Sequence, residues 1–107
     1  MSASADLHLT PELIIRAYRP GLFPMADAVD DPETFWVDPQ MRGVMPLEDF
    51  HVPRRLALTI KRAPFDVRID KDFRQTIEAC RRSSSDRPTS WINDDILFAY
   101  CKLHAMG

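Results

Sequence analysis

Apolar side chains at helical spacing predict two helices near the ends of the chain. Thr10 can cap the first helix, because its hydroxyl can accept from free backbone amides, and the proline after it suits the first helical position. Apolar residues then recur every three or four positions over 11–18. Asn93 can cap the last helix, whose apolar stripe covers 96–104 and which Gly107 would end.

Two further helices are predicted in the middle of the chain. Pro53 opens one that reaches about Arg62. Asp70 is placed to cap the other, in which Phe73 begins an apolar stripe with a period close to that of a helix. A polar loop over 81–90 follows and separates this helix from the last one.

Short strands are predicted in three places. Residues 65–69 alternate apolar and charged side chains, the pattern of a half-buried strand. Two apolar pieces, 34–37 and 43–45, lie between prolines and acidic residues and could also be strands. The rest of 22–46 is irregular, so the pattern by itself does not order these strands in a sheet.

The helix predicted over 53–62 carries its cations on one side. At about 100° per residue, its four basic residues fall within roughly 120° of one another around Leu58, with Leu56 and Ile60 on the opposite side. The four cations are Arg54, Arg55, Lys61 and Arg62. Such a face is either a solvated helix surface or a phosphate-binding patch, because clustered cations release counterions on meeting a nucleic-acid backbone.

Composition adds limits to this picture. Hydrophobic residues make up 45% and charged residues 28% of the 107 positions, as in a folded domain. The formal net charge of -2 gives no overall attraction to nucleic acid, so any such surface has to be local. No apolar run approaches the roughly 20 residues that cross a bilayer, and the first residues lack the regions of a signal peptide. We therefore expect a cytoplasmic protein without membrane association, in which Cys80 and Cys101 are buried free thiols.

Candidate catalytic chemistry is sparse. The chain has no Gly-rich phosphate loop, no Cys-x-x-Cys or His-x-x-x-His spacing and no nucleophile beside a recognisable base motif. The acidic pairs 30–31 and 94–95 fit turn and helix-start positions better than an acid–base pair, and His51 and His104 are expected to be structural or solvated. The residues alone predict no cofactor and no metal site, and they do not name a reaction.

Three stretches form an ordered set of motifs that covers most of the chain. AYRPGLFPM, 17–25, has Ala-Tyr followed by Gly-aliphatic-Phe-Pro. FWVDPQMRGVMP, 35–46, has a Trp, a Pro and an Arg in turn. SWIN and AYCKLHAMG, within 90–107, have Trp-Ile followed by Ala-Tyr-x-x-Leu-His-x-x-Gly. Together, from about Asp6 onward, the set resembles the bacterial leucyl/phenylalanyl-tRNA–protein transferase family.

This resemblance implies an α+β fold in two parts. Residues 1–46 would form a small N-terminal lobe, and residues 47–107 would form the first part of an acetyltransferase-like (GNAT) α/β domain. Because the family sequence continues beyond the last motif with a strand and a further half domain, we expect a truncated chain with an incomplete sheet. Such a sheet leaves an open edge and apolar faces, which favours self-association.

The resemblance also implies an aminoacyltransferase of the N-end rule. The family moves leucine or phenylalanine from leucyl- or phenylalanyl-tRNA to the N-terminal Arg or Lys of acceptor proteins, which marks them for degradation. An α-amine attacks an activated ester, so the site needs an apolar side-chain pocket, a stacking surface for the terminal adenine and cations for the acceptor stem. The catalytic residues are unknown here, because we expect them in the missing half, and the chain alone is expected to be inactive.

Eight residues are implied as site residues by the resemblance. Trp91 matches the pocket tryptophan of the family, although it could instead cover the core, and Tyr100 matches a tyrosine on the last helix. Trp36 belongs to the second motif, and Met25 stands where many members have tryptophan and should lie close to Trp91. The tRNA-binding residues would be Arg54, Arg55, Lys61 and Arg62.

Two other readings stay open. The chain could be a non-catalytic tRNA-binding or regulatory remnant of the same family. It could also be an unrelated helical interaction module, in which case the motif matches arise by chance.

Overall fold

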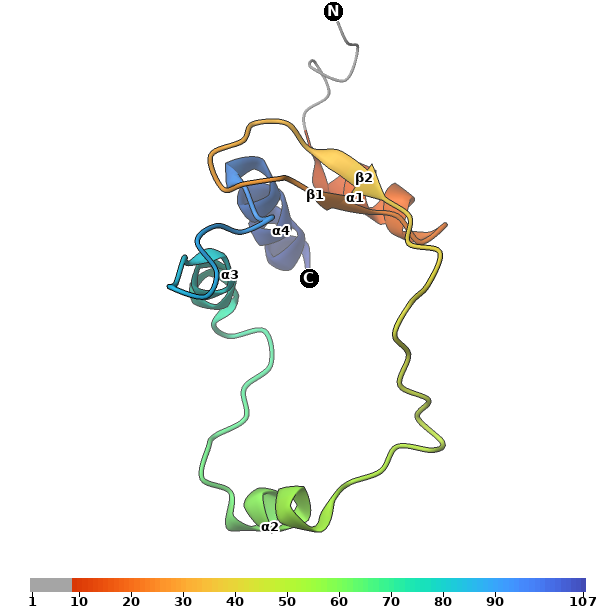
Figure 1. Cartoon of the computed structure of the whole chain (residues 1–107), viewed down its shortest axis with the longest axis vertical. Coiled ribbons are helices and arrows are strands. Elements are labelled where there is room, and N and C mark those ends of the chain that lie inside the picture. Colours follow the sequence, from red (N-terminus) through yellow and green to blue (C-terminus); the bar gives the residue numbers. More distant parts are fainter. Residues whose placement is uncertain (1–8) are drawn as a thin grey trace, which may run out of the picture. The chain divides into compact units, whose positions relative to one another are not determined.

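The computed structural model describes residues 9–107, so the predicted N-terminal lobe is described only from Leu9 onward (Figure 1). Over this part the fold is α+β, with four helices and one two-stranded antiparallel sheet, as predicted. The chain divides into two compact units, one formed by the segments up to Asp38 and from Asp70 onward, the other by 39–69. The boundary after residue 46 and the acetyltransferase-like topology stay predictions.

The first unit begins with α1, Pro11–Tyr18, which forms for the predicted local reasons. The Thr10 hydroxyl accepts a hydrogen bond from the Leu13 amide at 3.1 Å, and the helix buries Ile14 and Ala17. Two backbone bonds, Gly21 N to Tyr18 O at 2.9 Å and Leu22 N to Ala17 O at 2.8 Å, then turn the chain back along the helix. The turn needs a positive φ, which Gly21 adopts at 98° without a steric cost.

A two-stranded ribbon follows this turn. Strand β1, Phe23–Met25, pairs antiparallel with β2, Phe35–Val37. The strand predicted at 34–37 is confirmed, but β1 was missed because it contains Pro24. A two-stranded ribbon accepts this proline, since each strand has one edge without a partner strand.

Helices α3, Phe73–Arg81, and α4, Asp94–Met106, complete the first unit. Helix α4 starts and stops as predicted, with Asn93 as its cap and Gly107 after its last residue. The predicted cap of α3 was wrong: Asp72 is the cap, and Asp70 lies two residues earlier in the left-handed region with a φ of 60°. A residue with that φ lies outside the helix, so α3 starts later than the sequence indicated.

The core of the first unit forms where α4 meets the other elements. Its buried cluster consists of Ala26, Ile92, Ile96 and Leu97, with Leu9, Ile77, Tyr100 and Cys101 packed against it. Helix α4 packs against α1 and α3, and α1 packs against β1. Both cysteines are free, and Cys101 is partly buried, but the prediction that Cys80 is buried was wrong, because Cys80, next to the last residue of α3, is exposed.

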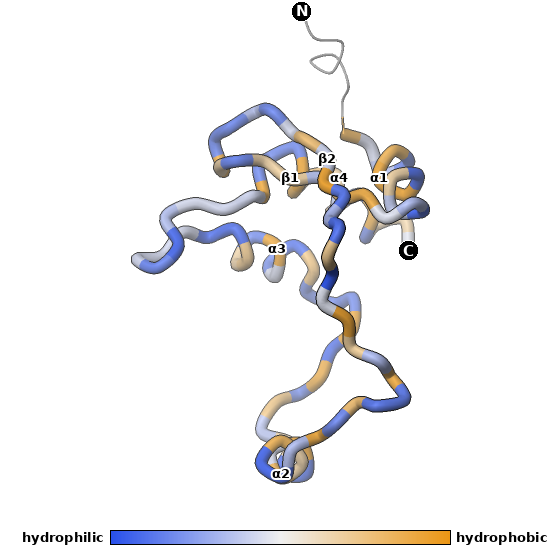
Figure 2. Tube along the Cα trace, turned by 45° about the vertical axis from the view of Figure 1, so that its right-hand side comes forward, coloured by the Kyte–Doolittle hydropathy of each residue, from blue (hydrophilic) through white to orange (hydrophobic). Residues whose placement is uncertain are grey.

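The second unit, 39–69, contains one helix, α2, Arg54–Arg62, as predicted. The strands predicted at 43–45 and 65–69 are absent, so both predictions were wrong. Within this unit no strand is available to pair with them, and Val44 and Val67 are 81% and 89% exposed. Apolar positions alternate with polar ones along the whole segment, as the orange and blue parts of Figure 2 show, without forming a buried core.

Among residues 9–107, no helix is long and apolar enough to cross a membrane.

Candidate functional site

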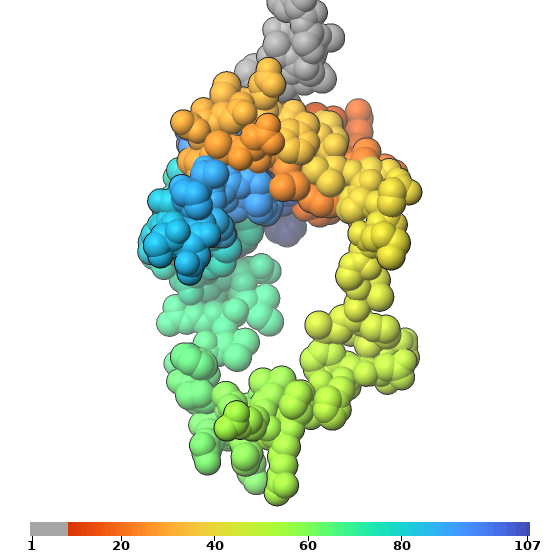
Figure 3. Space-filling view, in the orientation of Figure 1, coloured from red at the N-terminus to blue at the C-terminus, as the bar shows by residue number. Residues whose placement is uncertain are grey.

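The segment Ser90–Asn93, which we call the SWIN segment, lies beside the end of β1. The Ala26 amide donates to the Trp91 carbonyl at 2.9 Å, so the backbone at Trp91 adjoins the residue that follows Met25. In Figure 3 the orange surface of this part of the chain adjoins the blue surface of residues near 90. Met25 and Trp91 therefore belong to neighbouring backbone segments although they are far apart in sequence.

Burial alternates along the SWIN segment. Ser90 and Ile92 are each 4% exposed, whereas Trp91 between them is 42% exposed. The Ser90 hydroxyl accepts from the Ile92 amide at 3.2 Å, a local bond that turns the backbone at this point. The indole of Trp91 therefore contributes to the surface, and its role, in a pocket or as a cover over the core, stays a prediction.

The ribbon separates two of the predicted substrate residues. Met25 is opposite Phe35 in the register, and Pro24 is opposite Trp36. Because successive strand residues point to opposite faces, Met25 shares a face with Phe35, and Trp36 lies on the other face with the buried Pro24. Phe35 is 42% exposed and was missed from the sequence. Only the pairing of 23–25 with 35–37 identifies it as the aromatic neighbour of Met25.

Tyr100 is held by a second tyrosine that was not predicted as a site residue. Its hydroxyl lies 2.5 Å from the Tyr18 hydroxyl, and the two ring centroids are 6.4 Å apart. Burial raises the pKa of Tyr100 above its usual range, and the hydrogen bond with Tyr18 raises it further. Tyr100 is therefore neutral at physiological pH and can exchange hydrogen bonds, but it is not poised to act as a base.

The predicted tRNA-binding residues all lie on α2, in the second unit. Arg54, Arg55, Lys61 and Arg62 are exposed, and α2 contains no acidic residue. Leu56 and Ile60, expected to face a core, are 42% and 62% exposed. The helix thus presents a cationic face around Leu58 and an apolar face, both open to solvent within its unit.

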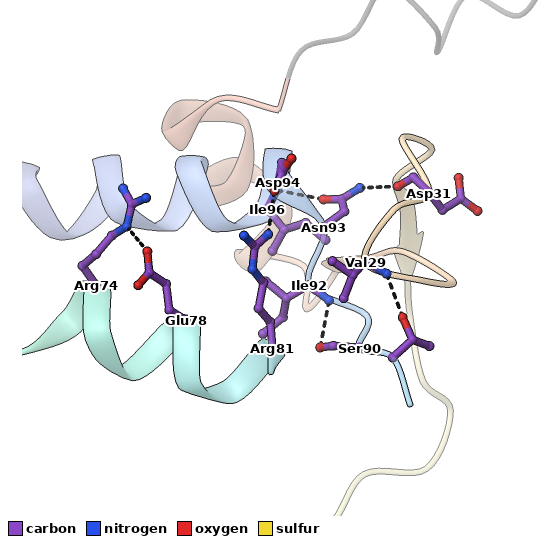
Figure 4. Close-up of polar contacts among 11 residues, drawn as sticks. Val29, Asp31, Arg74, Glu78, Arg81, Ser90, Ile92, Asn93, Asp94 and Ile96 are labelled. Carbon is purple, nitrogen blue, oxygen red and sulfur yellow. Dashed lines mark hydrogen bonds and ion pairs between the residues drawn. The ribbon is translucent and has the colours of Figure 1, made fainter. Parts of the chain in front are cut away.

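An open groove of 680 Å³ is lined by three segments of the first unit: 28–30, the end of α3, and the loop before the SWIN segment. None of the predicted substrate residues lines it. Two of its charged residues already have partners, since Arg81 bonds Asp94 at 2.6 Å and Glu78 bonds Arg74 at 2.6 Å (Figure 4). The Arg81–Asp94 pair joins the end of α3 to the first turn of α4.

No group of three or more His, Cys, Asp or Glu residues that could hold a metal ion occurs in the part of the chain from residue 9 onward.

Comparison with known families gives two matches that together cover nearly the whole sequence. Residues 8–40 match the family described as leucyl/phenylalanyl-tRNA protein transferase N-terminal domain. Residues 44–107, more than half of the chain, match leucyl/phenylalanyl-tRNA protein transferase. Met25 and Trp36 lie in the first match, and the other six predicted site residues lie in the second. The comparison with solved structures found no match.

Proposed function

Because the chain belongs to the leucyl/phenylalanyl-tRNA protein transferase family, we propose that it serves the transfer of leucine or phenylalanine from aminoacyl-tRNA to the N-terminal Arg or Lys of acceptor proteins. In this reaction the α-amine of the acceptor attacks the ester carbonyl. The new amide bond forms as the bond to the ribose oxygen breaks, and the proton lost by the amine balances the one gained by the ribose. The product is marked for degradation under the N-end rule, in the cytoplasm.

The main support for an aminoacyl-adenosine site in the first unit is the hydrogen bond that the Ala26 amide donates to the Trp91 carbonyl. It brings the backbone of Trp91, whose side chain is 42% exposed, beside the end of β1. An exposed indole is suited to stack on a base, and Met25 with Phe35 adds apolar surface for a leucine or phenylalanine side chain. Trp36 would then support the other face of the ribbon.

Tyr100 would supply a polar contact in the same reaction. When Tyr18 donates in their shared hydrogen bond, the Tyr100 hydroxyl keeps its own hydrogen to donate to a ribose or ester oxygen. Its raised pKa suits a neutral donor. No residue described in this structure is assigned as the base that removes the proton of the amine.

The cationic face of α2 would bind the phosphates of the tRNA acceptor stem. Its four cations carry no acidic neighbour on the helix, so an incoming phosphate does not have to displace an intrahelical ion pair. Neutralising phosphates releases counterions, which favours binding and makes it salt-dependent. This second site lies in the other compact unit, 39–69. Each of the two sites can therefore be tested by substitutions in its own unit.

The test of the aminoacyl-adenosine site uses a non-hydrolysable 3′-amide analogue of phenylalanyl-adenosine. Trp36→Phe leaves Trp91 as the sole tryptophan, so saturable quenching of its emission reports stacking. We expect phenylalaninamide without adenosine to quench weakly or not at all. No saturable quenching by the analogue would contradict the proposed site.

The exposed cationic face also favours one second function, tRNA binding without transfer. A transfer assay separates the two, with labelled phenylalanine moving from its tRNA to an Arg-starting peptide. Label on the peptide supports the transferase and contradicts the expectation that this chain alone is inactive, whereas tight tRNA binding without label is compatible with that expectation and with the binding protein.

We also propose that the chain associates with itself through 39–69. The large apolar side chains exposed in this unit, among them Met41, Val44 and Leu47, support the proposal, because such surface is costly to leave in water. Sedimentation at increasing protein concentration tests it. A mass that stays monomeric throughout would contradict it.

A further inference from the structure

Asn93 uses both ends of its side-chain amide, and it is only 3% exposed. The Oδ1 atom accepts from the Ile96 amide at 2.9 Å, which caps α4. The Nδ2 atom donates to the Asp31 carbonyl at 3.0 Å and to the Thr34 hydroxyl at 3.2 Å. Figure 4 shows Asn93 between Ile96 on one side and Asp31 on the other.

The two ends of this amide act on different parts of the first unit. The Oδ1 bond is local to α4, whereas the Nδ2 bonds reach the far end of the loop 26–34, which connects β1 to β2. The same loop is attached at its start by the Ala26–Trp91 backbone bond and in its middle by the Val29 amide, which donates to the Thr89 hydroxyl at 3.0 Å. The loop is thus tied to the SWIN segment and the residue before it along its whole length.

Capping alone does not account for an asparagine at this position. Serine and aspartate cap helices about as well as asparagine does, but neither combines the acceptor with two N–H donors. Both donors of Asn93 are used, and both go to the loop. The loop connects Met25, just before it, to Phe35, just after it, and its first residue is bonded to the Trp91 carbonyl.

We propose that Asn93 is a positioning residue for the aminoacyl-adenosine site, in which Nδ2 holds the Met25–Phe35 face in register with Trp91. The ligand in this inference rests on the proposed function. The attachment of the loop 26–34 by Nδ2 does not depend on it. The cap and the positioning bonds belong to different atoms, so a substitution can remove one and keep the other.

Asn93→Asp separates the two roles. The carboxylate keeps the cap and suits the positive end of α4, but it removes both donors and places an oxygen against the Asp31 carbonyl. We expect the helix content of the protein to stay unchanged while the amides of Ala26 and Val29 exchange faster with solvent. The Leu22 amide, bonded to Ala17 O elsewhere in the unit, is the internal reference and should not change. The Kd of the 3′-amide analogue should rise about tenfold, in proportion to the loss of a net hydrogen bond.

Two further variants keep the outcome interpretable. Thr10→Ala removes the cap bond of α1, which has no bond to the loop, so it should lower the melting temperature and leave the Kd unchanged. Thr34→Val removes one acceptor of Nδ2 without altering Asn93. This variant therefore tests whether Nδ2 positions the loop even if Asn93→Asp does not fold. It should raise the Kd and the exchange of Ala26 and Val29 in the same direction.

The proposal is overturned if these variants leave the exchange of Ala26 and Val29 and the Kd at their wild-type values, because Asn93 would then be a cap and nothing more. If the wild-type protein does not bind the analogue at all, the proposed function fails, and amide exchange alone still decides whether Nδ2 holds the loop.

Discussion

Replacing Trp91 by alanine gives the sharpest separation between a binding role and a structural one. Loss of an aromatic that stacks on a base costs about 1–3 kcal/mol, or roughly ten- to a hundredfold in affinity. Trp91 is already 42% exposed, so its truncation should cost well below the about 3–5 kcal/mol of a fully buried aromatic. We therefore expect Trp91→Ala to leave a folded protein whose Kd for the 3′-amide analogue rises at least about tenfold.

The assay combines calorimetric titration of the analogue with thermal unfolding of the same variant. Phe98→Ala is the matched control, because it removes another partly exposed aromatic side chain, 49% exposed on α4, that is not among the predicted site residues. We expect this control to lower the melting temperature and to change the Kd little. If Trp91→Ala instead lowers the melting temperature and leaves the Kd near wild type, the indole is a structural cover and the reasoning from its exposure is refuted.

Three further predictions concern the other candidate residues. Arg54→Glu combined with Lys61→Glu should weaken tRNA binding, and the plot of log affinity against log salt should become shallower by about 1 for each cation removed; an unchanged slope would exclude the cationic face of α2 as the contact. Because the pKa of Tyr100 is raised in the folded state, the stabilisation linked to its proton is present below pH 10 and is lost as pH rises through the raised value. Tyr18→Phe removes one cause of that shift, so Tyr100 should titrate at lower pH by phenolate absorbance, and an unchanged titration would mean that burial alone sets it. Met25→Trp should strengthen analogue binding or leave it unchanged, since a ring stacks better than a thioether, and a large loss of affinity would place Met25 outside the site.

Helix ends were the features best predicted from the sequence. Thr10 and Asn93 cap α1 and α4 as expected, because a cap is a bond between residues three apart and needs no distant partner. The failure at Asp70 shows the limit of that rule. This residue has the chemistry of a cap, but it adopts a positive φ, and its carbonyl oxygen lies 2.9 Å from the Nε2 atom of His104, 34 positions away.

Strands were predicted less well, because a strand exists only with a partner. The alternation over 65–69 is as good a strand pattern as that of 34–37, yet only the latter region finds a neighbour. That neighbour is β1, which contains Pro24 and carries no strand pattern of its own. Pairing across the ribbon therefore decided which of the short apolar segments became strands.

The family, the exposed cations of α2 and the residue types at the candidate site could be read from the linear chain, because ordered motifs and helical spacing are local properties. Which of these residues face the same way depends on how the segments fold against one another. The register of the ribbon put Phe35, and not Trp36, beside Met25, and the Nδ2 atom of Asn93 joined the SWIN segment to the loop between the strands. Both depend on hydrogen bonds between segments far apart in sequence, whose partners no local pattern specifies.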